Sequence, residues 1–400
     1  MTSLRKKVIF SLIPLLVLLF LAETTCRIKY YLLHDMESGY LIAPFGKQTH
    51  YSDLKGIKVD RCPEQKEFFS PCQGEVIIKS YFELGERCWA GEPFSLEKPQ
   101  GVYRILLVGG SSVECCLAGN EDTWGEQLEE QLNLSLADSC RYQVEVINGG
   151  RTARNAYDIK HLLMDTGFSL SPDLIVYYEA YNETNSAFIT YRMGIIARSW
   201  SGWLHKMLYL NSMLYTYLVE KRQFSMLRNQ YLISPELGNK PPVARFVESN
   251  FTPILESCRD RGVPVVYVRQ VIDYPLTKAG LNLVYMEDLA AGLQRIDDSQ
   301  ERRGKQTGEE EFTISDVIPL RQRMINFFQS EICRRHQVSV IDPLPAFDKA
   351  NSPGGPPLFT DLVHKTCYGN RLLAELISEA LRDRIKLEIA AREGKTTTMK

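Results

Sequence analysis

Ser111 stands in a glycine-rich turn that could present a reactive hydroxyl. The apolar run 103–108 predicts a buried strand, and Gly109-Gly110-Ser111-Ser112 follows it directly. Such turns also bind phosphate, but no third glycine stands at dinucleotide-binding spacing and no Lys-Ser or Lys-Thr pair completes a P-loop. The other use of this turn is a serine at a helix N-terminus, where N–H groups and the helix dipole stabilise a developing anion. Its spacing from the strand makes Ser111, rather than Ser112, the candidate nucleophile.

A second candidate pair lies near the end of the chain, in Asp361-Leu362-Val363-His364. An aspartate three residues before a histidine, on a loop entering a helix, can bond the imidazole Nδ1 and fix its tautomer. The free Nε2 could then take a proton from a serine hydroxyl. The alternative for this motif is a surface loop in which the aspartate caps the helix.

Two further motifs supply hydrogen-bond donors. Asn148-Gly149-Gly150 ends a second apolar run, and Tyr181-Asn182-Glu183 comes just after a third. The Gly150 N–H and the Asn182 side-chain amide are suitable donors for the oxyanion of a tetrahedral intermediate.

Five short apolar runs separated by helical patterns must position these residues. The runs are 103–108, 143–147, 172–178, 263–268 and 338–342. This alternation predicts a parallel sheet covered by helices on both faces. Active sites of such sheets lie at the carboxyl ends of the strands, where the candidate motifs fall.

In order along the chain, the four motifs resemble the blocks of the SGNH (GDSL-type) hydrolase superfamily. The resemblance covers roughly residues 103–385 and implies a three-layer α/β/α fold with a five-stranded parallel sheet in flavodoxin-like order. It implies that Ser111 is the nucleophile, that His364 is the base and that Asp361 orients the base. It also implies an oxyanion hole formed by the Ser111 N–H, the Gly150 N–H and the Asn182 amide.

The chain departs from the family pattern at three places. Gly110 replaces the aspartate of the name-giving motif, Ala180 stands where glycine is usual, and Glu183 stands where aspartate is usual. No atom of the implied triad is lost, and neither a metal nor an organic cofactor is implied. Cys333 and His336 could share a metal at helical spacing, but two ligands do not make a site.

The composition excludes several classes of protein. The 400 residues are 44% hydrophobic and 24% charged, which excludes a collagen, a disordered tail protein and a polytopic transporter. Basic and acidic side chains nearly cancel, at 47 and 49, so no global charge favours a nucleic-acid partner. The 10 cysteines are too few for a small disulfide scaffold and show no paired C-x-x-C spacing.

The N-terminus predicts export. Arg5, Lys6 and Lys7 precede an uncharged apolar stretch, 8–22, so we expect residues 1–26 to form an uncleaved signal anchor with the rest of the chain exported. A cleaved secretory signal is the main alternative, and lipid attachment through Cys26 a weaker one.

The remaining organisation follows from changes in the sequence pattern. Residues 27–100 predict a membrane-proximal stalk with a small β-rich cap. This segment contains Cys62, Cys72 and Cys88, and two of these three could form a disulfide. Residues 101–392 predict the hydrolase-like domain, interrupted by an aromatic-rich helical insert at 186–233. The charged run 299–311 predicts a solvated loop.

Together, these features lead us to expect a membrane-anchored, exported serine ester hydrolase. The resemblance and the expected location suggest acyl or acetyl esters of envelope carbohydrate or lipid as substrates. Two alternatives remain open: an O-acyltransferase that modifies polysaccharide, and an inactive SGNH-fold protein used for binding or assembly.

Overall fold

The computed structural model divides into two compact units, one formed by residues 1–58 and 188–230 and the other by residues 59–187 and 231–400. The second unit carries all of the candidate site residues. The residues that the structure describes are 13–14, 17–26, 28, 65–70, 75–84, 87–91, 93–137, 141–152, 154–184, 208, 214–215, 241–301, 314–351 and 354–398.

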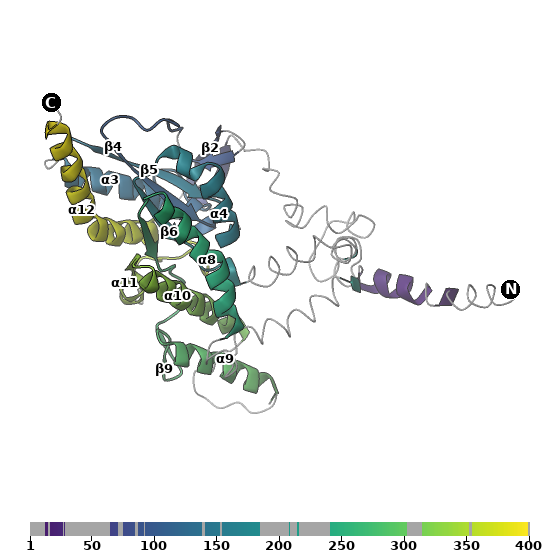
Figure 1. The fold of residues 1–400 in the computed structure, drawn as a ribbon. Helices are drawn as coiled ribbons and strands as arrows, with labels where there is room; N and C mark the ends of the chain where they lie inside the picture. Colours follow the sequence, from purple (N-terminus) through teal and green to yellow (C-terminus); the bar gives the residue numbers. More distant parts are fainter. Residues whose placement is uncertain are drawn as a thin grey trace. The chain divides into compact units, whose positions relative to one another are not determined.

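A five-stranded parallel sheet forms the centre of the larger unit (Figure 1). Its spatial order is β10-β7-β6-β4-β5, the flavodoxin-like order that the resemblance implied. The strand ends lie within three residues of the predicted runs: β4 (Val102–Gly109), β5 (Gln143–Gly150), β6 (Leu174–Tyr178), β7 (Val265–Val268) and β10 (Ser339–Ile341).

The register of the three strands at the switch point aligns their carboxyl ends. Gly109 at the end of β4 pairs with Gly150 on β5 and with Tyr178 on β6. β4 lies between β5 and β6, and the strand order proceeds in opposite directions on its two sides. A crevice is therefore expected outside this end of the sheet. Ser111 therefore emerges where the fold favours a ligand.

Helices cover both faces of the sheet because alternate strand residues point to opposite sides. On one face, Ile105 and Leu107 are buried with α3 (Trp124–Leu136), α11 (Leu344–Ala350) and α12 (Cys367–Thr398). On the other, Leu106 and Val108 are buried with α4 (Ala156–Asp165), α8 (Pro242–Asp260), α9 (Met286–Glu301) and α10 (Val317–Arg335). The result is a three-layer α/β/α unit.

Smaller elements complete this unit. An antiparallel sheet of β1 (Gln65–Ser70), β2 (Glu75–Leu84) and β3 (Arg87–Ala90) lies within the segment predicted to be β-rich. A two-stranded ribbon joins β8 (Thr277–Lys278) to β9 (Leu281–Asn282). Short helical turns in the described part of the chain include α2 (Ser111–Glu114), η4 (Gly167–Leu170) and η6 (Ile314–Asp316).

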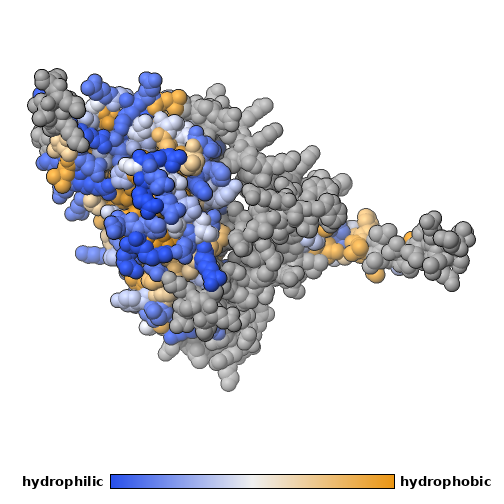
Figure 2. All heavy atoms as spheres, viewed as in Figure 1, coloured by the Kyte–Doolittle hydropathy of each residue, from blue (hydrophilic) through white to orange (hydrophobic). Residues whose placement is uncertain are grey.

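The first unit is described at few positions. Residues 17–26 are helical, and the side chains of Val17 to Leu21 are apolar and exposed, as the orange spheres of Figure 2 show. Within the described residues, no helix is both long and apolar enough to cross a membrane. Part of the predicted apolar stretch, most of the insert at 186–233 and most of the charged run 299–311 lie outside those residues. The proposed domain boundaries stay predictions.

Candidate active site

The turn after β4 presents Ser111 at the start of the one-turn helix α2. Gly110 is extended, and its carbonyl accepts hydrogen bonds of 3.1 Å from the N–H groups of both Val113 and Glu114. Ser112, Val113 and Glu114 are buried, whereas Ser111 is partly exposed. Of the two adjacent serines, Ser111 is thus the one that solvent or a substrate can reach.

Asp361, His364 and Ser111 form a continuous hydrogen-bonded chain. Asp361 Oδ2 lies 2.7 Å from Nδ1 of His364, and Nε2 of His364 lies 2.8 Å from Oγ of Ser111. This is the arrangement in which a carboxylate orients an imidazole that can deprotonate a hydroxyl. The structure therefore brings Ser111 together with the Asp361 and His364 pair, which the sequence placed in a separate motif.

The Asp361 carboxylate is held in its charged form. Burial acts to raise its pKa, but hydrogen bonds from the His364 ring and from the N–H groups of His364 and Val363 outweigh that effect, so the pKa is lowered. Oδ1 accepts those two N–H groups at 2.8 and 2.9 Å, which leaves Oδ2 for the ring. The same loop thus fixes both oxygens of the carboxylate.

Ser112 ties the nucleophile turn to the loop that carries the histidine. Its Oγ donates to the carbonyl of Val363 at 3.2 Å, and its own carbonyl accepts from Lys365 Nζ at 3.3 Å and from Trp124 Nε1 at 3.0 Å. Lys365 is buried, and its burial lowers the pKa of the ammonium group to about 8. These contacts hold the Ser111 hydroxyl at hydrogen-bonding distance from the His364 imidazole.

Asn182 lies beside the nucleophile turn, but its amide already has acceptors. Nδ2 donates to the carbonyl of Arg154 at 2.8 Å and to Oε2 of Glu179 at 3.2 Å. A Cβ on Gly110 would overlap this same Nδ2 atom, so the amide stands directly against the residue that precedes Ser111. The predicted neighbourhood is found, with both amide hydrogens engaged inside the protein.

Gly150 also lies against the turn, in a different way from the one predicted. A Cβ there would overlap the Glu114 nitrogen and lie 2.6 Å from the carbonyl carbon of Val113, so only glycine fits. Its N–H, however, donates to Oδ1 of Asn148 at 2.9 Å. To donate to an oxyanion, the Gly150 N–H would have to share its hydrogen between Asn148 Oδ1 and the oxyanion, or give up its bond to Asn148. The Ser111 N–H, in contrast, has no hydrogen-bond acceptor among the residues that the structure describes.

A buried polar network behind Asn182 was not predicted from the sequence. Gln270 Oε1 accepts the N–H groups of Ala180 and Tyr181 at 2.7 and 2.6 Å, and Gln329 Nε2 donates to the Glu179 carbonyl at 3.0 Å. Further residues complete it: Tyr267, Gln322 and Asn326. The available signal was a polar stripe along α10, where residues 322, 326 and 329 recur at helical spacing.

The cysteines give a second unpredicted feature. Cys367, three residues after His364, forms a disulfide. Cysteines that are not in a disulfide are found at positions 26, 115, 116, 258 and 333. Cys62 and Cys72, two of the residues considered for a bridge, lie outside the described part of the chain, as does the side chain of Cys88. No cluster of three or more metal-ligating side chains occurs in the described ranges.

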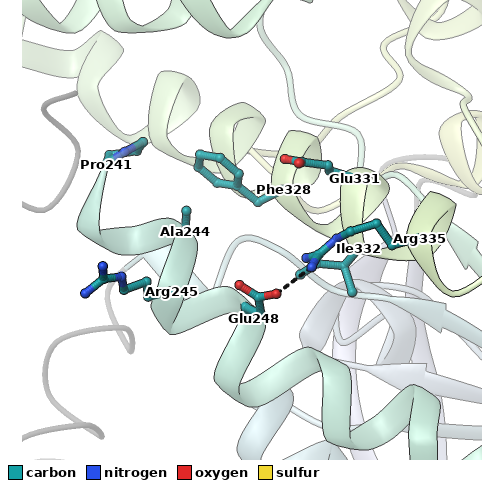
Figure 3. Close-up of a pocket in the computed structure, with 8 residues that line it drawn as sticks. All are labelled: Pro241, Ala244, Arg245, Glu248, Phe328, Glu331, Ile332 and Arg335. Carbon is teal, nitrogen blue, oxygen red and sulfur yellow. Dashed lines mark hydrogen bonds and ion pairs between the residues drawn. The ribbon is translucent and has the colours of Figure 1, made fainter. Parts of the chain in front are cut away.

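A cavity of about 150 Å³ between α8 and α10 is separate from this site (Figure 3). Ala244 and Phe328 form part of its wall, and the ion pair between Glu248 and Arg335 spans it at 2.7 Å. None of its lining residues belongs to the Ser111 site.

Comparison with known proteins gave similarities of fold only. No protein-family model matches the chain, and neither does any curated protein. Similar solved structures include an alpha/beta hydrolase enzyme from the metagenome of Lake Arreo, at 11% identity and a TM-score of 0.41, covering 70% of this chain and 94% of that one. A putative lipolytic protein of the G-D-S-L family from Desulfitobacterium hafniense is 10% identical, with a TM-score of 0.38 and coverages of 69% and 98%.

An acetyl xylan esterase from Geobacillus stearothermophilus is similar to the same degree. It is 12% identical, with a TM-score of 0.39 and coverages of 70% and 93%. At these identities and TM-scores the matches do not decide what the site does.

Proposed function

We propose that this protein is a serine ester hydrolase. The observation that carries the proposal is the hydrogen-bonded chain from Asp361 through His364 to Ser111, with distances of 2.7 and 2.8 Å. A hydroxyl bonded to a tautomer-fixed imidazole, at the carboxyl end of a central strand, suits nucleophilic attack on a carbonyl carbon.

The reaction proceeds through an acyl-enzyme. His364 Nε2 accepts the Ser111 proton while Oγ forms a bond to the ester carbonyl carbon, giving a tetrahedral oxyanion. The intermediate collapses as the carbon–oxygen bond to the alcohol breaks, and His364 returns its proton to that leaving oxygen. A water molecule then attacks the acyl carbon while His364 Nε2 takes one of its protons. The bond between that carbon and Ser111 Oγ breaks, His364 returns the proton to Oγ, and the carboxylic acid leaves.

The oxyanion would be met by the Ser111 N–H and the Asn182 amide. The Ser111 N–H lies in the first turn of α2, where it needs no partner within the helix. Asn182 contributes once one amide hydrogen turns from the Arg154 carbonyl toward the substrate oxygen, an exchange of one acceptor for another. Loss of such a donor costs about 10²–10³ in kcat in serine hydrolases.

The proposed substrates are acyl or acetyl esters of envelope carbohydrate or lipid, and the proposed setting is the exported side of a membrane. Basic residues before the apolar stretch support an N-terminal anchor, and the Cys367 disulfide supports an oxidising compartment. Cell fractionation that compares the full chain with a chain starting at Arg27 tests the anchor. If a sugar hydroxyl, rather than water, attacks the acyl-enzyme, the same residues perform acyl transfer.

One observation favours a second candidate, a non-catalytic binding protein. The Gly150 N–H and both Asn182 amide hydrogens have internal acceptors, as expected of a site that has lost its oxyanion hole. The intact triad favours the enzyme, because a binding protein has no need of a base on a serine.

A fluorophosphonate probe separates the two candidates. The wild-type protein should be labelled, and Ser111→Ala should not. Ser112→Ala is the matched control: it removes the neighbouring hydroxyl and one hydrogen bond to Val363 but keeps the triad, so labelling should persist. An unlabelled but folded wild type, or labelling that survives in Ser111→Ala, would refute the hydrolase.

A further inference from the structure

Glu179 occupies the space beside Gly110 that a side chain on that residue would need. A Cβ built on Gly110 overlaps Oε2 of Glu179 as well as Nδ2 of Asn182. The glycine before the nucleophile therefore leaves room for a carboxyl group that comes from the end of β6. This carboxyl group is 1% exposed, and the triad does not include it.

Three N–H groups from the two halves of the proposed oxyanion hole converge on this one carboxyl group. Oε2 accepts the Gly110 N–H at 2.9 Å and the Asn182 Nδ2 at 3.2 Å, and Oε1 accepts the Asn182 backbone N–H at 2.7 Å. Gly110 is joined through its peptide to the Ser111 N–H, and Asn182 carries the amide donor. Glu179 is thus the residue that bonds to both.

The backbone of Glu179 is itself fixed from behind. Gln329 on α10 holds its carbonyl, and Gln270 holds the next two N–H groups, those of Ala180 and Tyr181. Because Glu179, Gln270 and Gln329 are all buried, the carboxyl group is anchored to the sheet rather than to solvent. A group anchored in this way can set the positions of the donors that bond to it.

We propose that Glu179 is a positioning residue that aligns the Asn182 amide and the Ser111 peptide as oxyanion donors. The inference rests on the proposed hydrolase and adds to it a residue outside the triad. Glu179 touches no reacting atom, and it acts through Asn182 and Gly110.

A double-mutant cycle tests this coupling in the full chain, with p-nitrophenyl acetate as the substrate. Glu179→Gln keeps the side-chain shape but turns an NH₂ group toward N–H donors, so one bond is lost if the NH₂ group replaces Oε1 and two are lost if it replaces Oε2. We expect kcat to fall about tenfold or more with KM nearly unchanged, because the donors act in the transition state. In an Asn182→Ala background the same change should have a smaller effect on kcat, since one of the two donors that Glu179 aligns is gone.

Glu183→Gln is the matched control. Glu183 is also 1% exposed and lies four residues further on, but its carboxylate accepts the Ala156 N–H at the start of α4 instead of the groups at the turn. It should lower stability without lowering kcat in this way. If Glu179→Gln does not fold by circular dichroism, Gly110→Ala, which pushes on the same contacts from the other side, takes its place in the cycle.

The outcomes separate the two proposals. Suppose that the wild type is active and needs Ser111. An unchanged kcat in Glu179→Gln, or effects of the two substitutions on kcat that multiply fully in the double variant, then overturns the positioning role alone. A wild type that neither hydrolyses the ester nor reacts with a fluorophosphonate overturns both proposals.

Discussion

Nε2 of His364 lies 2.8 Å from Oγ of Ser111, although 253 positions separate the two residues in the chain. The sheet makes this possible, because β4 delivers the serine at the switch point and the loop before α12 returns to the same edge. Ser112 then fastens the two segments through its bonds to Val363 and Lys365. The proposed chemistry depends on the contact between His364 Nε2 and Ser111 Oγ.

Asp361→Asn tests whether the carboxylate orients the base. The asparagine oxygen can still accept the N–H groups of Val363 and His364, but its NH₂ group would face Nδ1 and favour the wrong imidazole tautomer. We expect kcat for p-nitrophenyl acetate to fall by about 10⁴ with the fold unchanged. Asp383→Asn, at an exposed position of α12, serves as the control. A decrease of less than tenfold would argue that Asp361 only caps the loop.

The sequence contained enough to predict the sheet and to indicate that Ser111 and His364 would lie at the same edge of it. Strands β4 to β6 are apolar runs ended by glycine or polar residues, and in a parallel sheet those ends share one edge. Ser111 and Asn182 are recognisable because each follows such a strand end. His364 is recognisable because it belongs to a motif with Asp361 three residues before it. Their nearness is a consequence of topology, which the alternation of strands and helices already predicts.

Features that depend on tertiary packing could not be predicted in the same way. Glu179 reads in sequence as an ordinary polar residue after a strand, and only the fold shows that it is buried among N–H groups. The Gly150 N–H was expected in the oxyanion hole, but the nearby Asn148 oxygen competes for it.

Gly150→Ala tests the close approach of β5 to the nucleophile helix. The added methyl group would overlap the Glu114 nitrogen, a backbone atom that cannot rotate away, so α2 must shift and carry Ser111 with it. We expect a loss of about 1–3 kcal/mol in unfolding free energy, together with a reduced kcat. Gly125→Ala is the control, because the nearest atom to its Cβ, at 3.0 Å, is the end of the Leu107 side chain. Normal activity in Gly150→Ala would show that the turn can yield.

Glu183 should make stability depend on pH. Its burial raises the pKa to about 7 in the folded protein, against 4.5 as the reference value. The folded state therefore holds the proton more tightly, and the stability gained below pH 4.5 is lost as the pH rises toward 7. Relative to Glu183→Gln, the wild type should lose on the order of 3 kcal/mol across this range, measured by urea unfolding. Parallel curves for the two proteins would contradict the burial of a carboxyl group there.

Lys365 should show the opposite sign at alkaline pH. Burial lowers its pKa from 10.5 to about 8, so the charged form is disfavoured in the folded state despite its bonds to Ser112 and its position over the Tyr178 ring. The unfolded chain binds more protons between these two values, and stability therefore rises with pH across them. Relative to Lys365→Met, the wild type should gain on the order of 3 kcal/mol between about pH 8 and 10.5. Lys349→Met, on the exposed side of α11, controls for the loss of a lysine as such. The stability difference between wild type and Lys365→Met could instead stay constant or fall over this pH interval. The Lys365 ammonium group would then reach solvent or a counter-charge, and its bond to the Ser112 carbonyl would not be buried.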